Sequence, residues 1–127
     1  PMLLAIDKHG RVPVYRQIVE QIQHLIVGGH LQRDEQVTSV RELAGTIKVN
    51  PMTVSKAYSI LESEGWLERR PGVGLFVSES PGNASAKQAL VEDALREPAR
   101  IATDLGMGPD EAIGILRRLM AGQGEKT

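Results

Sequence analysis

The sequence predicts a mainly α-helical fold with one small β-hairpin, followed by two further helices. Apolar residues recur every three to four positions over most of the chain, which is typical of amphipathic helices. Two short runs with aromatic and branched apolar residues, 66–69 and 75–78, flank a Gly-rich turn at 71–74 and predict the hairpin. The segment 80–85 is rich in turn-forming residues, so we expect it to divide the 127-residue chain into two parts.

The first part begins with a short strand expected at Leu3–Ile6 and a helix expected at 13–27. Pro13 suits a first helical turn, because its missing N–H would be unpaired there anyway. Gly28 and Gly29 suit the helix end, because glycine accepts a left-handed backbone. The apolar stripe of this helix consists of Val14, Ile18, Ile22, Leu25 and Ile26.

Two capping signals mark the next helices, after a polar connector from residue 30 to residue 37. Ser39 with Glu42 three residues later is a capping-box pattern, which predicts a short helix at 40–47. Asn50 caps a third helix, and Pro51 sits at its first position. The tight turn between the two helices predicts a helix-turn-helix.

The start of the third helix carries a polar face opposite its apolar stripe. With Val54 and Leu61 turned inward, Asn50 and Thr53 can hydrogen-bond to base edges or phosphates. Lys56 can reach a phosphate, and the positive end of the helix dipole favours an anion nearby. Such a helix fits the major groove of duplex DNA.

The hairpin adds a basic wing. Arg69 and Arg70 lead into its turn, and Gly72 and Gly74 let it approach the sugar-phosphate backbone or the minor groove. Arg41, on the second helix, is placed to touch the strand beside the groove. The residues predicted to contact DNA are Arg41, Asn50, Pro51, Met52, Thr53, Ser55, Lys56, Arg69, Arg70, Gly72 and Gly74.

Composition excludes several classes but does not itself indicate nucleic-acid binding. The formal net charge is −1, and residues 1–78 carry nine Lys and Arg against eight Asp and Glu. The prediction therefore rests on where the cations lie. Cysteine is absent, which excludes disulfides and suits a cytoplasmic location. No apolar run could span a membrane and no signal peptide is recognisable, so we expect no membrane association.

Catalytic and metal chemistry find no support in the residues. His9, His24 and His30 are isolated rather than set at metal-ligand spacing, and the carboxylates are scattered. We expect no enzymatic activity and no metal site. No residue cluster indicates a cofactor, and a small-molecule effector remains unidentified.

Several motifs together resemble the GntR family of bacterial transcription regulators, over about residues 13–78. They are PVYRQI (13–18), SVRELA (39–44), NPMTVSKAY (50–58), LESEGWL (61–67) and RPGVGLFV (70–77). The resemblance implies a winged helix-turn-helix that binds a palindromic operator as a dimer. It places the family's DNA contacts at Arg41, Asn50, Pro51, Thr53, Ser55 and Gly72.

The chain departs from many family members at two positions. Pro51 and Ser55 stand where arginine is common, so phosphate contacts should be weaker or the base preference altered. The pattern Asn-Pro-x-Thr-Val-x-Lys-Ala-Tyr is typical of the YtrA-like branch and of the branch fused to an aminotransferase domain. Two short helices after the wing resemble the YtrA-like arrangement, in which a small C-terminal part serves dimerisation.

The expected domains are a winged helix-turn-helix at 1–79, a linker at 80–85 and a helical dimerisation region at 86–127. Pro98 should kink or divide the first of the two C-terminal helices. Their apolar stripes exceed what one small unit can bury, and pairing with a second copy would cover them. Packing back onto the first helix as extra core is the alternative. The predicted dimerisation residues are Leu90, Ala94, Ile101, Leu105, Ile113, Leu116, Leu119 and Met120.

From these features we expect a sequence-specific DNA-binding transcription regulator, a repressor, that acts as a homodimer. Its recognition helix would enter the major groove beside a basic wing. The alternative is a winged-helix protein-interaction module that does not bind DNA. The near-neutral charge and the two missing arginines favour that alternative, and the basic wing opposes it.

Overall fold

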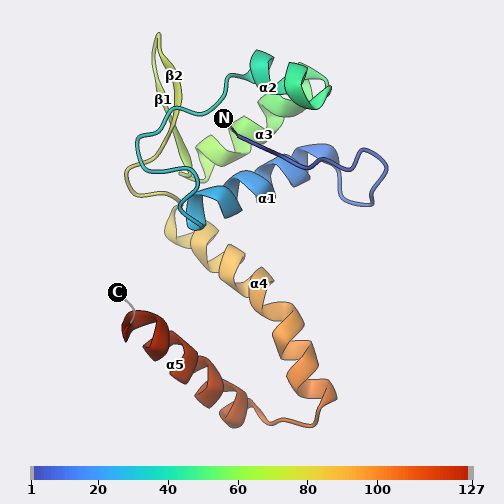
Figure 1. Cartoon of the computed structure of the whole chain (residues 1–127), viewed down its shortest axis with the longest axis vertical. Helices are drawn as coiled ribbons and strands as arrows, with labels where there is room; N and C mark the ends of the chain where they lie inside the picture. Colours follow the sequence, from blue (N-terminus) through green and yellow to red (C-terminus); the bar gives the residue numbers. More distant parts are fainter. Residues whose placement is uncertain (1, 126–127) are drawn as a thin grey trace. The chain divides into compact units, whose positions relative to one another are not determined.

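The computed structural model describes residues 2–125, and side chains through residue 122. It confirms the predicted fold class, mainly α-helical with a two-stranded wing (Figure 1). Contacts divide the chain after Lys87 into two compact units. The elements are α1 (Val14–Val27), α2 (Val40–Ile47), α3 (Pro51–Ser63), β1 (Leu67–Arg70), β2 (Gly74–Val77), α4 (Ala84–Asp104) and α5 (Pro109–Glu125).

In the first unit, α3 is the central element. It packs against α1, α2 and β1, so its apolar stripe meets three neighbours (Figure 1). Burial of each large aliphatic side chain stabilises the fold by roughly 1.5–3 kcal/mol, which makes this the main source of stability. The largest fully buried side chains are Trp66, Tyr58, Ile18, Ile22, Leu43, Leu61, Leu67, Val19, Val54 and Val77.

The helix-turn-helix begins and ends where its capping residues predict. The N–H of Glu42 donates to Ser39 Oγ at 3.1 Å, and the N–H of Met52 donates to Asn50 Oδ1 at 2.8 Å. Lys48 ends α2 in the left-handed conformation, at φ 55°. Each N-cap satisfies one of the otherwise unpaired backbone donors at its helix start.

The hairpin pairs β1 with β2 in antiparallel register, from Leu67 opposite Val77 to Arg70 opposite Gly74. The two strands lie within one residue of their predicted positions. The connector expected to be only polar loop also contributes to the sheet. Gln36 forms an isolated β-bridge with Phe76 at the edge of this two-stranded sheet.

The strand predicted at Leu3–Ile6 is wrong. This segment is irregular, and the side-chain amide of Gln21 both accepts from the N–H of Ala5 and donates to its carbonyl, at 2.9 and 2.7 Å. Gln17 makes the same paired contact with Asp7. Side chains of α1 thus supply the hydrogen bonds that a neighbouring strand would have given.

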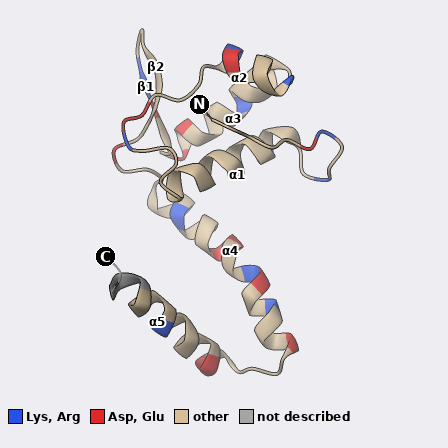
Figure 2. Cartoon of the chain, in the orientation of Figure 1, with Lys and Arg blue, Asp and Glu red and all other residues tan. Residues whose placement is uncertain are grey.

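In the second unit, α4 is continuous across Pro98, so the predicted division of this helix is wrong. Figure 2 shows basic and acidic residues interspersed along α4. Arg96 pairs with Glu92 and Asp93, and Arg100 pairs with residues three before and four after it. These pairs flank Pro98 on the exposed surface of the helix, where opposite charges three or four residues apart favour the helical conformation.

The start of α4 is held against the end of α3. Gly82 donates its N–H to the carbonyl of Gly65 at 2.9 Å, and Asn83 donates to that of Glu64 at 2.8 Å. Asn83 also caps α4, since its Oδ1 accepts from the N–H of Ala86 at 2.7 Å. The segment expected to be a linker at 80–85 is therefore packed at residues 82–83, and α4 begins within it.

Replacing Gly82 by alanine should destabilise the first unit by about 2–4 kcal/mol. Gly82 is at φ 80°, and an added Cβ would lie 2.9 Å from the Trp66 ring. Gly72 has φ 78° with nothing within 4 Å, so Gly72→Ala tests the backbone strain alone. Urea unfolding at one protein concentration measures both variants, and equal losses would contradict a clash with Trp66.

Candidate nucleic-acid interface

The helix α3 separates a buried stripe from an exposed face. Val54, Ala57, Tyr58 and Leu61 are all buried, as their spacing predicts. The exposed residues on the other side, from the start of the helix onward, are Pro51, Met52, Ser55, Lys56, Ser59 and Ser63. The predicted recognition face is thus presented to solvent, although Thr53 within it is half-buried.

Tyr58 ties this helix to the segment that precedes α2. Its hydroxyl donates to the carbonyl of Thr38 at 2.6 Å. Burial raises the pKa of Tyr58 well above its usual value, and the negative charge of Glu42 raises it further. The phenol therefore stays protonated as a donor at physiological pH, which fixes α3 relative to the N-cap of α2.

A cleft of about 230 Å³ lies between α3, the wing and the segment leading into α2. Serine hydroxyls from α3 and one arginine from β1 line it, together with the start of β2. Hydroxyls and a guanidinium are groups that bind phosphate oxygens. The lining residues are Gln36, Val37, Thr38, Ser39, Val40, Ser55, Tyr58, Ser59, Arg69, Val73, Gly74 and Leu75.

The two arginines of the wing have different surroundings. Arg69 lines the cleft and pairs with Glu62 of α3 at 3.2 Å. Arg70 is on the opposite face of the strand, because successive side chains alternate. Its guanidinium pairs with Asp34 at 2.7 Å and lies 4.0 Å from the centre of the Phe76 ring. The structure therefore brings Arg69, but not Arg70, to the recognition helix.

The two other basic residues predicted to contact DNA, Lys56 and Arg41, also differ in their surroundings. Lys56 Nζ lies 3.9 Å from the centre of the Tyr15 ring, a cation–π contact with α1. Arg41 is exposed near the start of α2, and it makes no ion pair within residues 2–122. Of the basic residues predicted to touch DNA, Arg41 is the one with a guanidinium not already engaged in a salt bridge.

The wing tip is built around glycine. Gly72 is exposed and has φ 78°, a conformation that residues with a side chain rarely adopt, and an added Cβ would meet no atom within 4 Å. Gly74 lies against Gln36, whose amide donates to the carbonyl of Val73 at 3.0 Å. The side chain of Gln36 thus holds the turn, a contact that the sequence did not predict.

Comparison with known protein families identifies the family of this chain. The model described as "Bacterial regulatory proteins, gntR family" matches residues 14–77, half of the chain, and spans α1 to β2. The chain belongs to the GntR family. The matched segment contains the helix-turn-helix, the wing and the cleft between them, so this GntR chain carries the candidate interface within its family domain.

Named relatives extend the match beyond the family domain. The chain is 42% identical over 90 residues to the HTH-type transcriptional repressor YtrA of Bacillus subtilis, covering 71% of this chain and 65% of that one. A solved structure of YtrA from Sulfolobus acidocaldarius is 30% identical, with a TM-score of 0.60 over 94% of this chain and 97% of that one. This GntR chain thus spans slightly less than two thirds of the bacterial repressor.

A third similar structure includes nucleic acid. It is AraR(DBD) in complex with operator ORX1, which is 29% identical to this GntR chain, with a TM-score of 0.55. The match covers 61% of this chain and all of that one. The fold of the first unit is therefore one that a related domain uses while bound to its operator.

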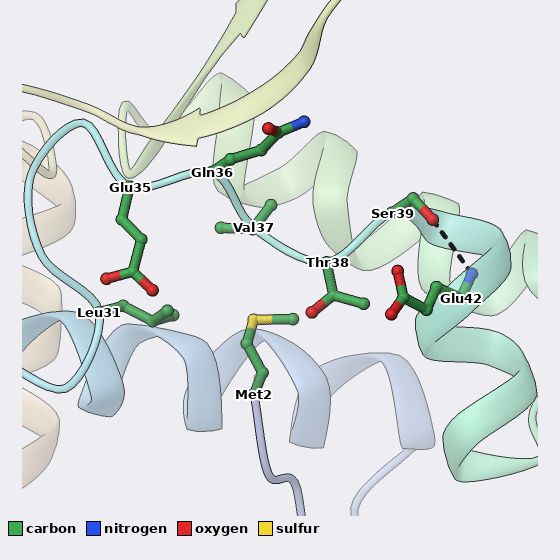
Figure 3. Close-up of a pocket in the computed structure, with 8 residues that line it drawn as sticks. All are labelled: Met2, Leu31, Glu35, Gln36, Val37, Thr38, Ser39 and Glu42. Carbon is green, nitrogen blue, oxygen red and sulfur yellow. Dashed lines mark hydrogen bonds between the residues drawn. The ribbon is translucent and has the colours of Figure 1, made fainter.

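A second pocket lies on the other side of the segment that precedes α2. It measures about 360 Å³, and its floor is formed by Met2, Leu31 and Val37. Figure 3 shows the side chains of Glu35 and Glu42 toward its two ends, with Met2 between them. Two carboxylates repel phosphate, so this pocket is not part of the candidate interface.

The predicted dimerisation residues lie on α4 and α5, except Leu105, which directly follows α4. None of the residues of α4 is buried. On α5, Leu116, Leu119 and Met120 are 39%, 62% and 65% exposed. No helix within residues 2–125 has the length and apolar character required to cross a membrane. The second unit, described by itself, thus leaves its apolar side chains in water.

Proposed function

We propose that this GntR chain is a sequence-specific DNA-binding repressor of transcription that acts in the cytoplasm as a homodimer on a palindromic operator. The recognition helix α3 enters the major groove by its N-terminal turn. The cleft beside it receives the sugar-phosphate backbone, and the wing tip at Gly72 lies on the adjacent strand or minor groove.

One observation carries the proposal. One cleft is lined by Ser55 and Ser59 from the exposed face of α3 and by Arg69 of the wing, and it reaches Val40, the residue before the exposed Arg41. Phosphate contacts from such groups position a protein on DNA, and base contacts from the helix start give specificity. The operator complex of AraR, a related domain, supports this use of the fold.

The homodimer rests on the second unit. The stripes of α4 and α5 hold large apolar side chains that are more than one third exposed, among them Ile101 at 44% and Leu116 at 39%. Contiguous exposed apolar surface marks an association site, and a second copy would present the same stripes in return. A two-fold dimer also matches an operator with two half-sites. We propose repression rather than activation because YtrA of Bacillus subtilis, a relative of this chain, is a transcriptional repressor.

The alternative is a protein-interaction module that does not bind DNA. The net charge of −1 and the missing arginines at Pro51 and Ser55 favour it. The structure adds that Lys56 and Arg69 are already engaged by Tyr15 and Glu62. Exposed pairs of this kind are worth less than about 1 kcal/mol, so a phosphate can replace the intramolecular partner. The free Arg41 favours the DNA-binding function.

Replacing Arg41 by alanine should weaken binding to duplex DNA about tenfold, for specific and random sequences alike. Loss of one phosphate contact should also reduce the slope of log affinity against log salt by about one. Fluorescence anisotropy with the purified chain, over several salt concentrations, measures both. The probe is a duplex selected by the protein from a random library.

Arg33 provides the matched control. It is exposed in the same unit. The next residue, Asp34, donates its N–H to the carbonyl of Val77, at the end of the hairpin far from Gly72. Arg33→Ala removes the same charge, yet it should leave affinity and slope nearly unchanged. Equal effects of the two substitutions would mean that Arg41 acts through net charge alone, which contradicts the proposed interface.

A further inference from the structure

We propose that Met52 is a specificity-determining residue that reads the 5-methyl group of a thymine in each half-site. This inference rests on the proposed function and adds the chemical class of base that the recognition helix selects. It comes from the position of Met52 on α3 and from the lack of arginine, asparagine and glutamine within that helix.

Met52 is placed to enter a groove. It is the second residue of α3, and its side chain is 78% exposed, on the face opposite the buried Val54 and Leu61. Its backbone N–H is already used by the Asn50 cap. The N-terminal turn of a recognition helix is the part that approaches base edges most closely. At this point of the surface, the chain presents a thioether and methyl rather than a hydrogen-bonding group.

The rest of the helix offers few groups for polar readout. Guanine is usually read by arginine or lysine, and adenine by asparagine or glutamine. The helix α3 contains no arginine, asparagine or glutamine, and its single lysine, Lys56, is the residue proposed to bind a phosphate. The amide oxygen of Asn50, just before the helix, is occupied by capping. Base contacts from α3 must therefore come from hydroxyls and from apolar side chains.

The thymine methyl is the complementary apolar group. It is the apolar feature that the base pairs display in the major groove, and apolar side chains contact it directly. A flexible, polarizable methionine can adjust to cover a methyl group without exact preorganisation. Covering Met52 also removes an exposed large apolar side chain from water. The geometry thus points to a half-site in which a thymine lies under the N-terminal turn of α3.

The test replaces single thymines by deoxyuridine, which pairs in the same way and lacks only the methyl. A duplex enriched by the full chain from a random library is synthesised with each thymine exchanged in turn, and affinities are measured by anisotropy. One thymine per half-site should be sensitive, with about a fourfold loss for each methyl, as expected for one buried methyl group. The variant Met52→Ala should bind the thymine and deoxyuridine duplexes equally.

Val27 supplies the control, since it is 65% exposed at the end of α1, outside α3 and the wing. Val27→Ala should keep the full deoxyuridine sensitivity. Unchanged affinity of the natural chain for every deoxyuridine duplex would overturn the inference, as would sensitivity that persists in Met52→Ala. A library from which no sequence is enriched would instead overturn the proposed function itself, and this inference with it.

Discussion

Replacing Leu116 by aspartate should convert the proposed dimer to a monomer and weaken its binding to a duplex with two half-sites by about 10²–10⁴-fold. Leu116 lies within the apolar stripe of α5 and is partly exposed in the single chain. A charge buried there would have to be desolvated without a partner, which costs several kcal/mol, about 3 or more. Once the copies separate, the second half-site no longer binds at a high effective concentration.

The size of the particle and its affinity should be measured together, by sedimentation and by anisotropy at one protomer concentration. Ala121→Asp is the matched control, because it adds the same charge to an exposed position away from the stripe. Affinity for a single half-site should be equal in both variants. A Leu116→Asp protein that stays dimeric and keeps its operator affinity would contradict the assignment of this stripe.

Replacing Trp66 by alanine should reduce the free energy of unfolding by about 3–5 kcal/mol, a large part of what a small domain has. The ring is 2% exposed and lies against Gly82, and its Nε1 donates to Glu64 at 3.3 Å. The substitution leaves a cavity where the end of α3, β1 and the start of α4 are held together. Trp66→Phe, which keeps part of the ring, should lose less than half as much.

Unfolding in urea should be followed by far-UV circular dichroism, because Trp66 is the single tryptophan and its fluorescence disappears with it. The protomer concentration must be the same throughout, since a dimer gains stability with concentration. A loss below about 1 kcal/mol for Trp66→Ala would mean that the ring does not contribute to the core as its burial indicates.

Local signals predicted the helix-turn-helix well. The caps at Ser39 and Asn50 and the proline at Pro51 act within one helical turn, so their sequence spacing determines the hydrogen bonds that form. The apolar stripe of α3 is similarly local, because a helix of known start has a fixed periodicity. These features placed the recognition face before any tertiary contact was known.

Contacts between distant residues could not be predicted in the same way. Arg70 looked equivalent to Arg69, and only the strand register and Asp34, far back in the chain, separate their surroundings. The sequence predicts a polar loop at Gln36, yet this residue forms a β-bridge with Phe76. The N-terminal segment reads as a strand because the pattern cannot show that glutamines of α1 supply its hydrogen bonds. Each depends on a partner that periodicity does not encode.

The most direct test of the account is the binding of the purified full chain to its selected duplex, at several salt concentrations and with excess random duplex as competitor. We predict tight binding that resists the competitor and weakens steeply with salt, because each phosphate contact releases counterions. Binding that is no tighter than to random duplex would contradict sequence-specific recognition, and binding that does not change with salt would contradict the proposed phosphate contacts.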